Sequence, residues 1–264
     1  MKNSTKLNVI NAKNWPWPRL ITHRGGGNYA PENTLAAFRA GAAYGFKMME
    51  YDVKLSKDGV EILLHDDDIQ RTSNGQGKAA SYTLSELQTY DFGGWHSQTY
   101  DGEPIATLAA IAHYTQQQSI HSNIEIKPSK GVEHLTGRTI ALQAQKLWNK
   151  ALLPPLLSSF SKVALQSALD AAPALPRALL IEGKLPNDWE YQLRQLQCVG
   201  INLDSTIVTH ELSTEILHKG YALTVWTVND LARAQELLRW GCHGIITDAI
   251  TTINPGRLKE FLGP

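Results

Sequence analysis

The sequence predicts a (β/α)₈ barrel, the TIM-barrel class, on three observations. The chain has 264 residues, and single barrels of this type often run to about 250 residues. Short apolar runs alternate with amphipathic stretches along the chain, as expected for parallel strands joined by helices. No linker rich in proline, glycine or serine divides the chain, so we expect one domain over residues 1–264. On this pattern alone, a doubly wound open sheet is the main alternative.

Eight apolar runs are the predicted strands: Leu20–His23, Met48–Val53, Asn123–Ile126, Leu156–Ser159, Ala178–Ile181, Val199–Leu203, Ala222–Thr227 and Gly244–Thr247. Most are followed by stretches with apolar residues at spacings of three and four, which are typical of helices that face a core. These stretches are Thr34–Tyr44, Thr107–Gln118, Leu135–Trp148, Lys162–Ala171, Asp188–Leu196, Thr209–His218 and Asp230–Trp240. Asn33 and Asp230 are expected to cap the first and seventh helices, because both residue types favour the N-cap.

The connection after the second strand is too long for a plain strand-to-helix loop. The segment "GVEILLH" predicts an extra or continuing strand, and it is followed by "SNGQGK" and "DFGGWHSQTYDGEPI". Long ordered connections in compact domains are usually functional. We therefore expect a small insertion at about residues 68–105.

Composition and charge limit the classes of partner. Apolar residues make up 42% of the chain, and the formal net charge is zero, so nothing favours nucleic acid or a membrane surface. The first 20 residues contain no apolar core of a signal peptide, and no run is long enough to span a membrane. Cys198 and Cys242 form no CxxC pair, as expected for buried thiols in a reducing compartment. We expect a cytoplasmic protein; the sequence does not predict its oligomeric state.

Charged residues occupy alternating positions on two predicted strands. Glu50 and Asp52 lie two apart, as do Glu125 and Lys127, and residues two apart in a strand point the same way. Buried charges are costly unless they are paired or bind metal. The three carboxylates can converge on one divalent cation, Mg²⁺ or Ca²⁺, since both prefer oxygen ligands. The alternative for either pair alone is a simple ion pair between Glu50 or Glu125 and Lys127 or Arg24, but two such pairs on parallel strands favour the metal site.

Two histidines end predicted strands. His23 directly precedes Arg24, and His65 ends "EILLH". A histidine is a good general acid or base near neutral pH, and two of them can divide the work of taking and giving a proton. Arg24 and Lys127 supply positive charge suited to phosphate oxygens. Together with a metal, these groups suit the cleavage of a phosphodiester.

The motifs that surround these residues resemble one known family, the glycerophosphodiester phosphodiesterases, and most closely its cytosolic bacterial members associated with glycerol-3-phosphate uptake. They run in that family's order from residue 18 to about 248, and "HRG" with "PENT" before an E-x-D strand is a specific combination. The motifs are "HRGGGNYAPENT", "EYDVKLSKDG", "LLHDD", "RTSNGQG", "NIEIKP", "PPLLSSF", "TVWTVN" and "LLRWGCHGIITD".

The resemblance implies a TIM barrel with a small insertion after strand 2, and it implies roles for individual residues. Position by position, the catalytic histidines fall on His23 and His65, the metal ligands on Glu50, Asp52 and Glu125, and the phosphate-side basic groups on Arg24 and Lys127.

Three further positions keep an alternative. Trp226 matches an aromatic position near the glycerol, and Phe160 is another candidate wall, but both can also be core aromatics. Glu32 matches a position near the metal, but a carboxylate also suits the first turn of a helix. We expect Gly25, Gly26 and Gly27 to let the backbone turn where side chains would crowd the substrate.

The implied reaction is hydrolysis of a glycerophosphodiester, such as glycerophosphocholine or glycerophosphoethanolamine, to sn-glycerol 3-phosphate and an alcohol, through a cyclic phosphate. Two other functions stay open at this point. One is a lyase on phospholipid head groups that stops at the cyclic product, which the absence of an amphipathic anchor disfavours. The other is a non-catalytic phosphate-binding module, which the full set of site residues disfavours.

Overall fold

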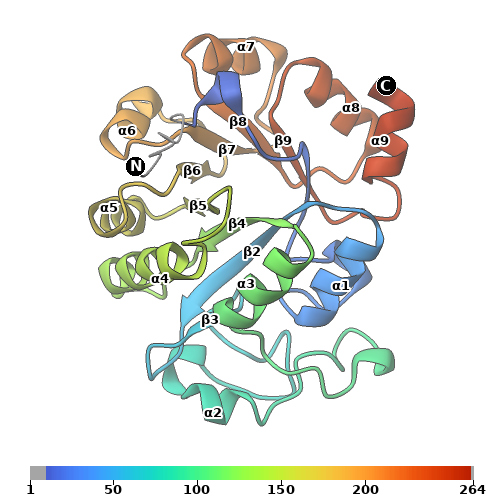
Figure 1. The fold of residues 1–264 in the computed structure, drawn as a ribbon, viewed down its shortest axis with the longest axis vertical. Helices are drawn as coiled ribbons and strands as arrows, with labels where there is room; N and C mark the ends of the chain where they lie inside the picture. The colour runs from blue at the N-terminus through green and yellow to red at the C-terminus, as the bar shows by residue number, and fades with distance from the viewer. Residues whose placement is uncertain (1–9, 263–264) are drawn as a thin grey trace, which may run out of the picture.

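Eight parallel strands close into a barrel (Figure 1). The structure is a computed structural model that describes residues 10–262. Strand β1 pairs with both β9 and β2, which closes the ring and excludes the open sheet. The barrel strands are β1 (Leu20–Thr22), β2 (Met48–Leu55), β4 (His121–Ile126), β5 (Leu156–Ser159), β6 (Arg177–Ile181), β7 (Gly200–Asp204), β8 (Ala222–Trp226) and β9 (Gly244–Thr247).

Helices surround the barrel (Figure 1). They are α1 (Leu35–Ala43), α3 (Leu108–Gln117), α4 (Glu133–Leu147), α5 (Lys162–Ala171), α6 (Trp189–Gln195), α7 (His210–His218), α8 (Leu231–Arg239) and α9 (Pro255–Leu262). The seven predicted helices are confirmed to within two residues at each end, and α9 is an addition. Among residues 10–262, no helix has the length and apolarity needed to cross a bilayer.

The connection after β2 contains the predicted extra strand. Strand β3 (Glu61–Leu63) runs antiparallel to β2, with Lys54 opposite Ile62. The chain then forms the short helix α2 (Leu84–Leu87) and lies beside β3 and α3, outside the ring of helices (Figure 1). This segment has a small core of its own, made of Ile62, Leu64, Ile69, Ala79, Leu87, Phe92 and Ile105. The apolar cluster fixes the segment beside the carboxyl ends of the barrel strands.

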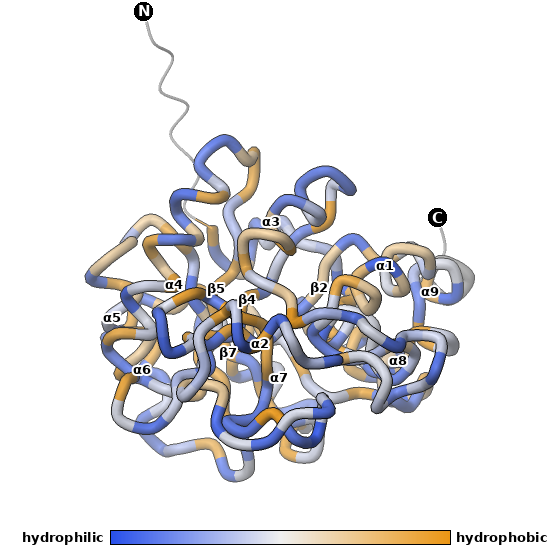
Figure 2. The backbone as a smooth tube through the Cα atoms, turned by 90° about the horizontal axis from the view of Figure 1, so that it is seen from below, coloured by the Kyte–Doolittle hydropathy of each residue, from blue (hydrophilic) through white to orange (hydrophobic). Residues whose placement is uncertain are grey.

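The barrel interior changes from apolar to polar along its axis. Toward the amino ends of the strands, the interior is filled by one buried cluster of Trp17, Ile21, Met48, Leu156, Ala178 and Ile246. The next inward positions of the same strands carry polar groups, including Glu50 and Ser158. The larger core lies between strands and helices, and the outer helices alternate between hydrophobic and hydrophilic residues (Figure 2). The apolar layer supports a polar layer at the carboxyl ends of the strands.

The first helix is capped by a different residue from the one predicted. Thr34 is the N-cap of α1, and its hydroxyl accepts a hydrogen bond from the Ala37 backbone. Asn33 was predicted as this cap, and that prediction is wrong. Asn33 is buried with φ at 60°, and its amide donates to Asp52 Oδ2 at 2.9 Å while its Oδ1 accepts from the Asp52 N–H at 3.1 Å. The Asn33 side chain is therefore bound to Asp52 of β2 and does not cap the helix. The predicted cap of α8, Asp230, is confirmed.

The glycines after His23 make room for protein atoms. At Gly27, φ is +54°, and an added Cβ would lie 2.2 Å from the Asp248 carbonyl oxygen. At Gly25, an added Cβ would lie 2.8 Å from the Phe38 ring. The turn can therefore approach the loop after β9, to which Asn28 donates a backbone hydrogen bond at the Asp248 oxygen, 3.1 Å away.

Replacing Gly27 with alanine should test this close approach. We expect Gly27→Ala to lower the free energy of unfolding by roughly 3 kcal/mol, from the left-handed backbone and the backbone clash together. Gly59 is the matched control, since its φ is +78° and nothing lies within 4 Å of an added Cβ. Gly59→Ala should cost only about 1–2 kcal/mol. Urea unfolding of both variants makes the comparison, and equal costs would contradict the clash.

Candidate active site

A cavity of about 360 Å³ opens at the carboxyl ends of the barrel strands. Eight of the ten predicted site residues line it: His23, Arg24, Glu50, His65, Glu125, Lys127, Phe160 and Trp226. The strand ends gather these residues from positions up to about 200 apart in the sequence. Active sites of barrel enzymes lie at this end, so this cavity is the candidate active site.

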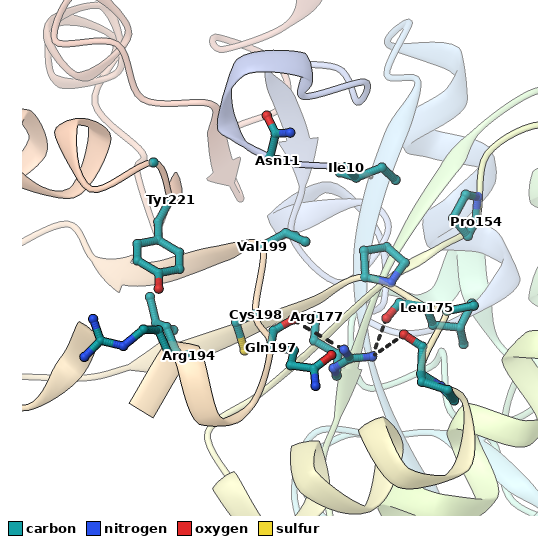
Figure 3. A pocket seen from close by; sticks show the side chains of 15 residues that line it. Ile10, Asn11, Pro154, Leu175, Arg177, Arg194, Gln197, Cys198, Val199 and Tyr221 are labelled. Atoms are coloured by element: carbon teal, nitrogen blue, oxygen red, sulfur yellow. Dashed lines mark hydrogen bonds between the residues drawn. The ribbon is translucent and has the colours of Figure 1, made fainter. Parts of the chain in front are cut away.

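A larger cavity of about 570 Å³ lies at the opposite end of the barrel (Figure 3). It is bordered by residues that precede strands β5 to β8, among them Pro154, Cys198 and Tyr221. The Arg177 guanidinium beside it donates to backbone carbonyl oxygens, including that of Leu196 at 3.2 Å. None of the predicted site residues reaches this cavity, and the amino ends of barrel strands serve stability rather than catalysis.

The three predicted metal ligands converge. Glu50, Asp52 and Glu125 each offer a carboxylate oxygen, and these oxygens lie within 4.8 Å of one another. Asp52 and Glu125 are direct neighbours in the β2–β4 register, which is why two strands suffice to bring the three together. All three side chains are buried. The buried Oε1 of Glu50 accepts no hydrogen bond.

The electrostatics of this cluster suit a cation. Burial, together with the neighbouring Asp52 and Glu125 carboxylates, raises the pKa of Glu50 well above its usual range. Burial and the Asp52 charge raise the pKa of Glu125 to about 7. Burial also acts to raise the pKa of Asp52, but Lys127 and Arg24 outweigh it and lower that pKa. Because the oxygens are close, buried and partly without partners, the residues fit a divalent cation.

The two basic groups contact the same carboxylates. Lys127 Nζ lies 3.0 Å from Glu125 Oε1 and 3.4 Å from Asp52 Oδ1, and Arg24 Nε lies 3.4 Å from Asp52 Oδ2. The simple ion pair that was the alternative for Glu125 is therefore present. It coexists with the carboxylate cluster, because the charges of both kinds meet at the same strand ends.

Each histidine is held by an aspartate. His23 Nδ1 lies 2.7 Å from Asp248 Oδ1, and Asn229 donates to the other oxygen of Asp248 at 3.2 Å. His65 Nδ1 lies 2.7 Å from Asp66 Oδ1. A carboxylate against Nδ1 keeps the proton there and leaves Nε2 for proton transfer. Burial lowers the pKa of His65 although Asp52 opposes the effect, which favours the neutral form.

Sequence reasoning did not assign roles to Asp66 and Asp248. Both belong to quoted motifs, "LLHDD" and "GIITD"; Asp248 directly follows β9, and Asp66 is the third residue after β3. Asp66 could have been found from the sequence, because it directly follows the candidate histidine His65. The partnership of Asp248 with His23 depends on β9 lying beside β1, a pairing that no local pattern predicts.

Glu32 lies between two arginines. Arg24 donates to Glu32 Oε1 at 2.8 Å, and Arg71 donates to both carboxylate oxygens at 2.7 and 2.8 Å. Burial acts to raise the pKa of Glu32, but these arginines outweigh it and lower that pKa. Arg71 also donates to Asp66 at 2.6 Å. Glu32 is outside the group of three converging carboxylates. Through Arg24 and Arg71, it links the turn after β1 to the loop that contains His65 and Asp66.

Both aromatic residues line the cavity, and Trp226 also packs against the apolar cluster of the barrel interior. The rings of Phe160 and Trp226 meet edge to face, with centroids 5.4 Å apart, and Phe160 is 39% exposed. Lys127 Nζ lies 5.6 Å from the centre of the Phe160 ring. An apolar wall therefore stands beside the charged groups. Acidic, basic and imidazole groups at one barrel mouth define a candidate hydrolase of phosphate esters.

Comparison with known proteins identifies the family. The model of the glycerophosphoryl diester phosphodiesterase family matches residues 23–252. A glycerophosphodiester phosphodiesterase of Caldanaerobacter subterraneus subsp. tengcongensis is 31% identical over 89% of this chain and 95% of its own length. One of Bacillus subtilis is 29% identical over 86% of this chain and 82% of its own length.

A solved structure extends the comparison to three dimensions. A phosphodiesterase of Oleispira antarctica, in complex with the product sn-glycerol-3-phosphate, superposes with a TM-score of 0.85 at 31% identity. The match covers 96% of this chain and 99% of that one. The chain belongs to the glycerophosphoryl diester phosphodiesterase family, and it is accordingly an enzyme that cleaves phosphodiesters of glycerol.

Removing the partner of His23 should slow catalysis without unfolding the protein. We expect Asp248→Asn to lower kcat by roughly 10- to 100-fold, because the amide no longer fixes the proton on Nδ1. Asp204 at the end of β7 is the matched control, since its carboxylate accepts from Thr206 and contacts neither histidine. Steady-state kinetics with a folded Asp204→Asn variant should give kcat within about twofold of the natural enzyme. An equal loss in both variants would contradict the role of Asp248.

The raised pKa of Glu125 predicts a pH-dependent stability of the metal-free protein. Its pKa rises from 4.5 to about 7 on folding, so the folded state holds the proton more tightly. The stability contribution is complete below pH 4.5 and is lost as the pH rises through about 7. The melting temperature should therefore fall between about pH 6 and about pH 8, and less so in Glu125→Gln. Thermal unfolding at both pH values checks this, and identical slopes would contradict it.

Proposed function

We propose that this protein hydrolyses glycerophosphodiesters, such as glycerophosphocholine or glycerophosphoethanolamine, to sn-glycerol 3-phosphate and an alcohol. The observation that carries the proposal is one cavity lined by two histidines, each bound by an aspartate, beside three converging carboxylates, in a chain of this family. The complex of the Oleispira antarctica enzyme with sn-glycerol-3-phosphate supports the same product class.

Substrate binding is assigned to two basic residues and two aromatic residues. Arg24 and Lys127 take the phosphate oxygens, since guanidinium and ammonium groups suit them. Trp226 and Phe160 form the apolar wall against the glycerol carbons. One divalent cation, Mg²⁺ or Ca²⁺, would be held by Glu50, Asp52 and Glu125, and it would offset the negative charge that develops on the phosphate.

Proton transfer is assigned to His23 and His65 as a pair. One imidazole takes the proton of the glycerol 2-hydroxyl, whose oxygen then forms a bond to phosphorus. The bond from phosphorus to the leaving alcohol breaks, and the other imidazole gives that alcohol its proton. Water then opens the cyclic phosphate with the two roles reversed. The aspartates on Nδ1 keep both rings oriented, so each histidine acts through Nε2 at every step.

The wider setting is part of the proposal. A single domain over residues 1–264 and a cytoplasmic location both stay predictions. Cys198 and Cys242 are buried free thiols, and burial raises the pKa of each to about 12. Such thiols are unreactive.

Activity assays test the function. Glycerophosphocholine should be hydrolysed with Mg²⁺ or Ca²⁺ added, and turnover should disappear in chelator-treated protein. His23→Ala and His65→Ala should each stay folded and lose roughly 100-fold or more in kcat, as expected for loss of a general acid or base. The measurement is the release of sn-glycerol 3-phosphate with time.

Three outcomes would contradict the proposal. Near-normal activity in both histidine variants removes their assigned roles. Unchanged turnover in verified metal-free protein removes the cation site. A stable cyclic phosphate as the final product, detected by ³¹P NMR, replaces the hydrolase with a lyase. Any metal-dependent turnover excludes a purely binding function.

A further inference from the structure

Lys54 is a buried lysine just beyond the carboxylate cluster. It lies on β2 two residues after Asp52, so its side chain leaves the same face of the strand, and that side chain is 1% exposed. The pairing of β2 with β4 ends at Val53, and Lys54 instead faces Ile62 of β3. Lys54 therefore lies at the rim of the barrel, in the part of β2 that extends beyond its pairing with β4.

The ammonium group of Lys54 binds the loop that follows β3. It donates to the backbone carbonyl oxygen of Asp66 and to Asp67 Oδ1 at 2.8 Å. These residues directly follow His65, whose ring is oriented by Asp66. A buried ammonium is tolerated only with such partners. The hydrogen bonds of Lys54 therefore hold the loop after His65 against β2, the strand that carries Glu50 and Asp52.

Asp67 extends this contact to a third segment. Its Oδ1 also accepts from the Ser129 hydroxyl at 3.0 Å, and Ser129 lies two residues after Lys127. Its backbone oxygen accepts from the Ala79 N–H at 2.9 Å. The Lys54–Asp67 contact therefore connects the strand of the carboxylates, the loop of His65 and the loop of Lys127.

Arg71 holds the same loop from the outside. It contacts the Asp66 carboxylate at 2.6 Å, and its side chain is 45% exposed. Lys54 differs because it is buried and binds the backbone of Asp66 rather than its side chain. Arg71 orients the carboxylate, whereas Lys54 sets where the loop itself lies.

We propose that Lys54 is a positioning residue for His65. By fixing the 65–67 backbone against β2, Lys54 sets the distance between the His65 imidazole and the phosphate that the carboxylate cluster and Lys127 locate. This inference rests on the proposed function of the site. It adds a residue whose ammonium group binds the protein and not the substrate.

A double-mutant cycle tests the inference with glycerophosphocholine as the substrate. We expect Lys54→Met to lower kcat by about 10-fold or more, since small displacements of catalytic groups are costly, while KM stays within about twofold. In the His65→Ala background, the same change should lower kcat less than about twofold, because there is no longer an imidazole to position. Lys57→Met, which removes an exposed lysine from the following turn, is the control and should leave kcat unchanged.

Two further arms keep the test decisive. If Lys54→Met does not fold, Asp67→Ala removes the carboxylate partner of Lys54 from a side chain that is 51% exposed, and the resulting loss of kcat should likewise depend on His65. Equal fold-losses of kcat in the natural enzyme and in the His65→Ala variant, or no loss at all, overturn the inference. Absence of turnover in the natural enzyme would instead refute the proposed function, so the two failures are distinguishable.

Discussion

Three carboxylates are buried beside one another on the adjacent strands β2 and β4, and the structure of the site follows from how their charge is balanced. Carboxylates this close repel one another, and burial strengthens the repulsion. Arg24 and Lys127 contact Asp52 from two sides, at 3.4 Å each, and Asn33 donates to the same carboxylate. Glu125 Oε1 pairs with Lys127 Nζ at 3.0 Å, whereas Glu50 Oε1 accepts no hydrogen bond, which is the property expected of a cation ligand.

The basic groups that balance this charge are also the groups assigned to the substrate phosphate. A bound cation would satisfy the carboxylates and leave Arg24 and Lys127 freer to meet a phosphate, so cation and substrate would support each other electrostatically. The layer of Ile21, Met48, Leu156 and Ala178 beneath keeps the charged layer at the barrel mouth, where water and substrate have access.

The loop after β3 shows how an insertion is made part of a barrel site. Its small apolar core fixes it beside β3, but an apolar core does not set the position of one imidazole to a fraction of an ångström. Polar contacts do so: Arg71 reaches Asp66 and Glu32, and Lys54 reaches Asp66 and Asp67. Glu32, which matched a family position near the metal, thereby connects the two histidine segments through its arginines.

The sequence by itself determined the alternation of strands and helices, the strand-end carboxylates and the two histidines, because periodicity and alternation act over a few residues. It also placed His23, Arg24 and three glycines in one turn, although the glycines proved to accommodate Phe38 and the Asp248 backbone. Only the tertiary structure decided which groups meet. Asp248 reaches His23 across 225 positions because β9 closes the barrel on β1. Thr34 rather than Asn33 caps α1, because the Asn33 amide donates to Asp52. Lys54, a charged residue of β2, supports His65 through its contacts with Asp66 and Asp67. Such partners depend on packing between distant segments, and no local pattern carries that information.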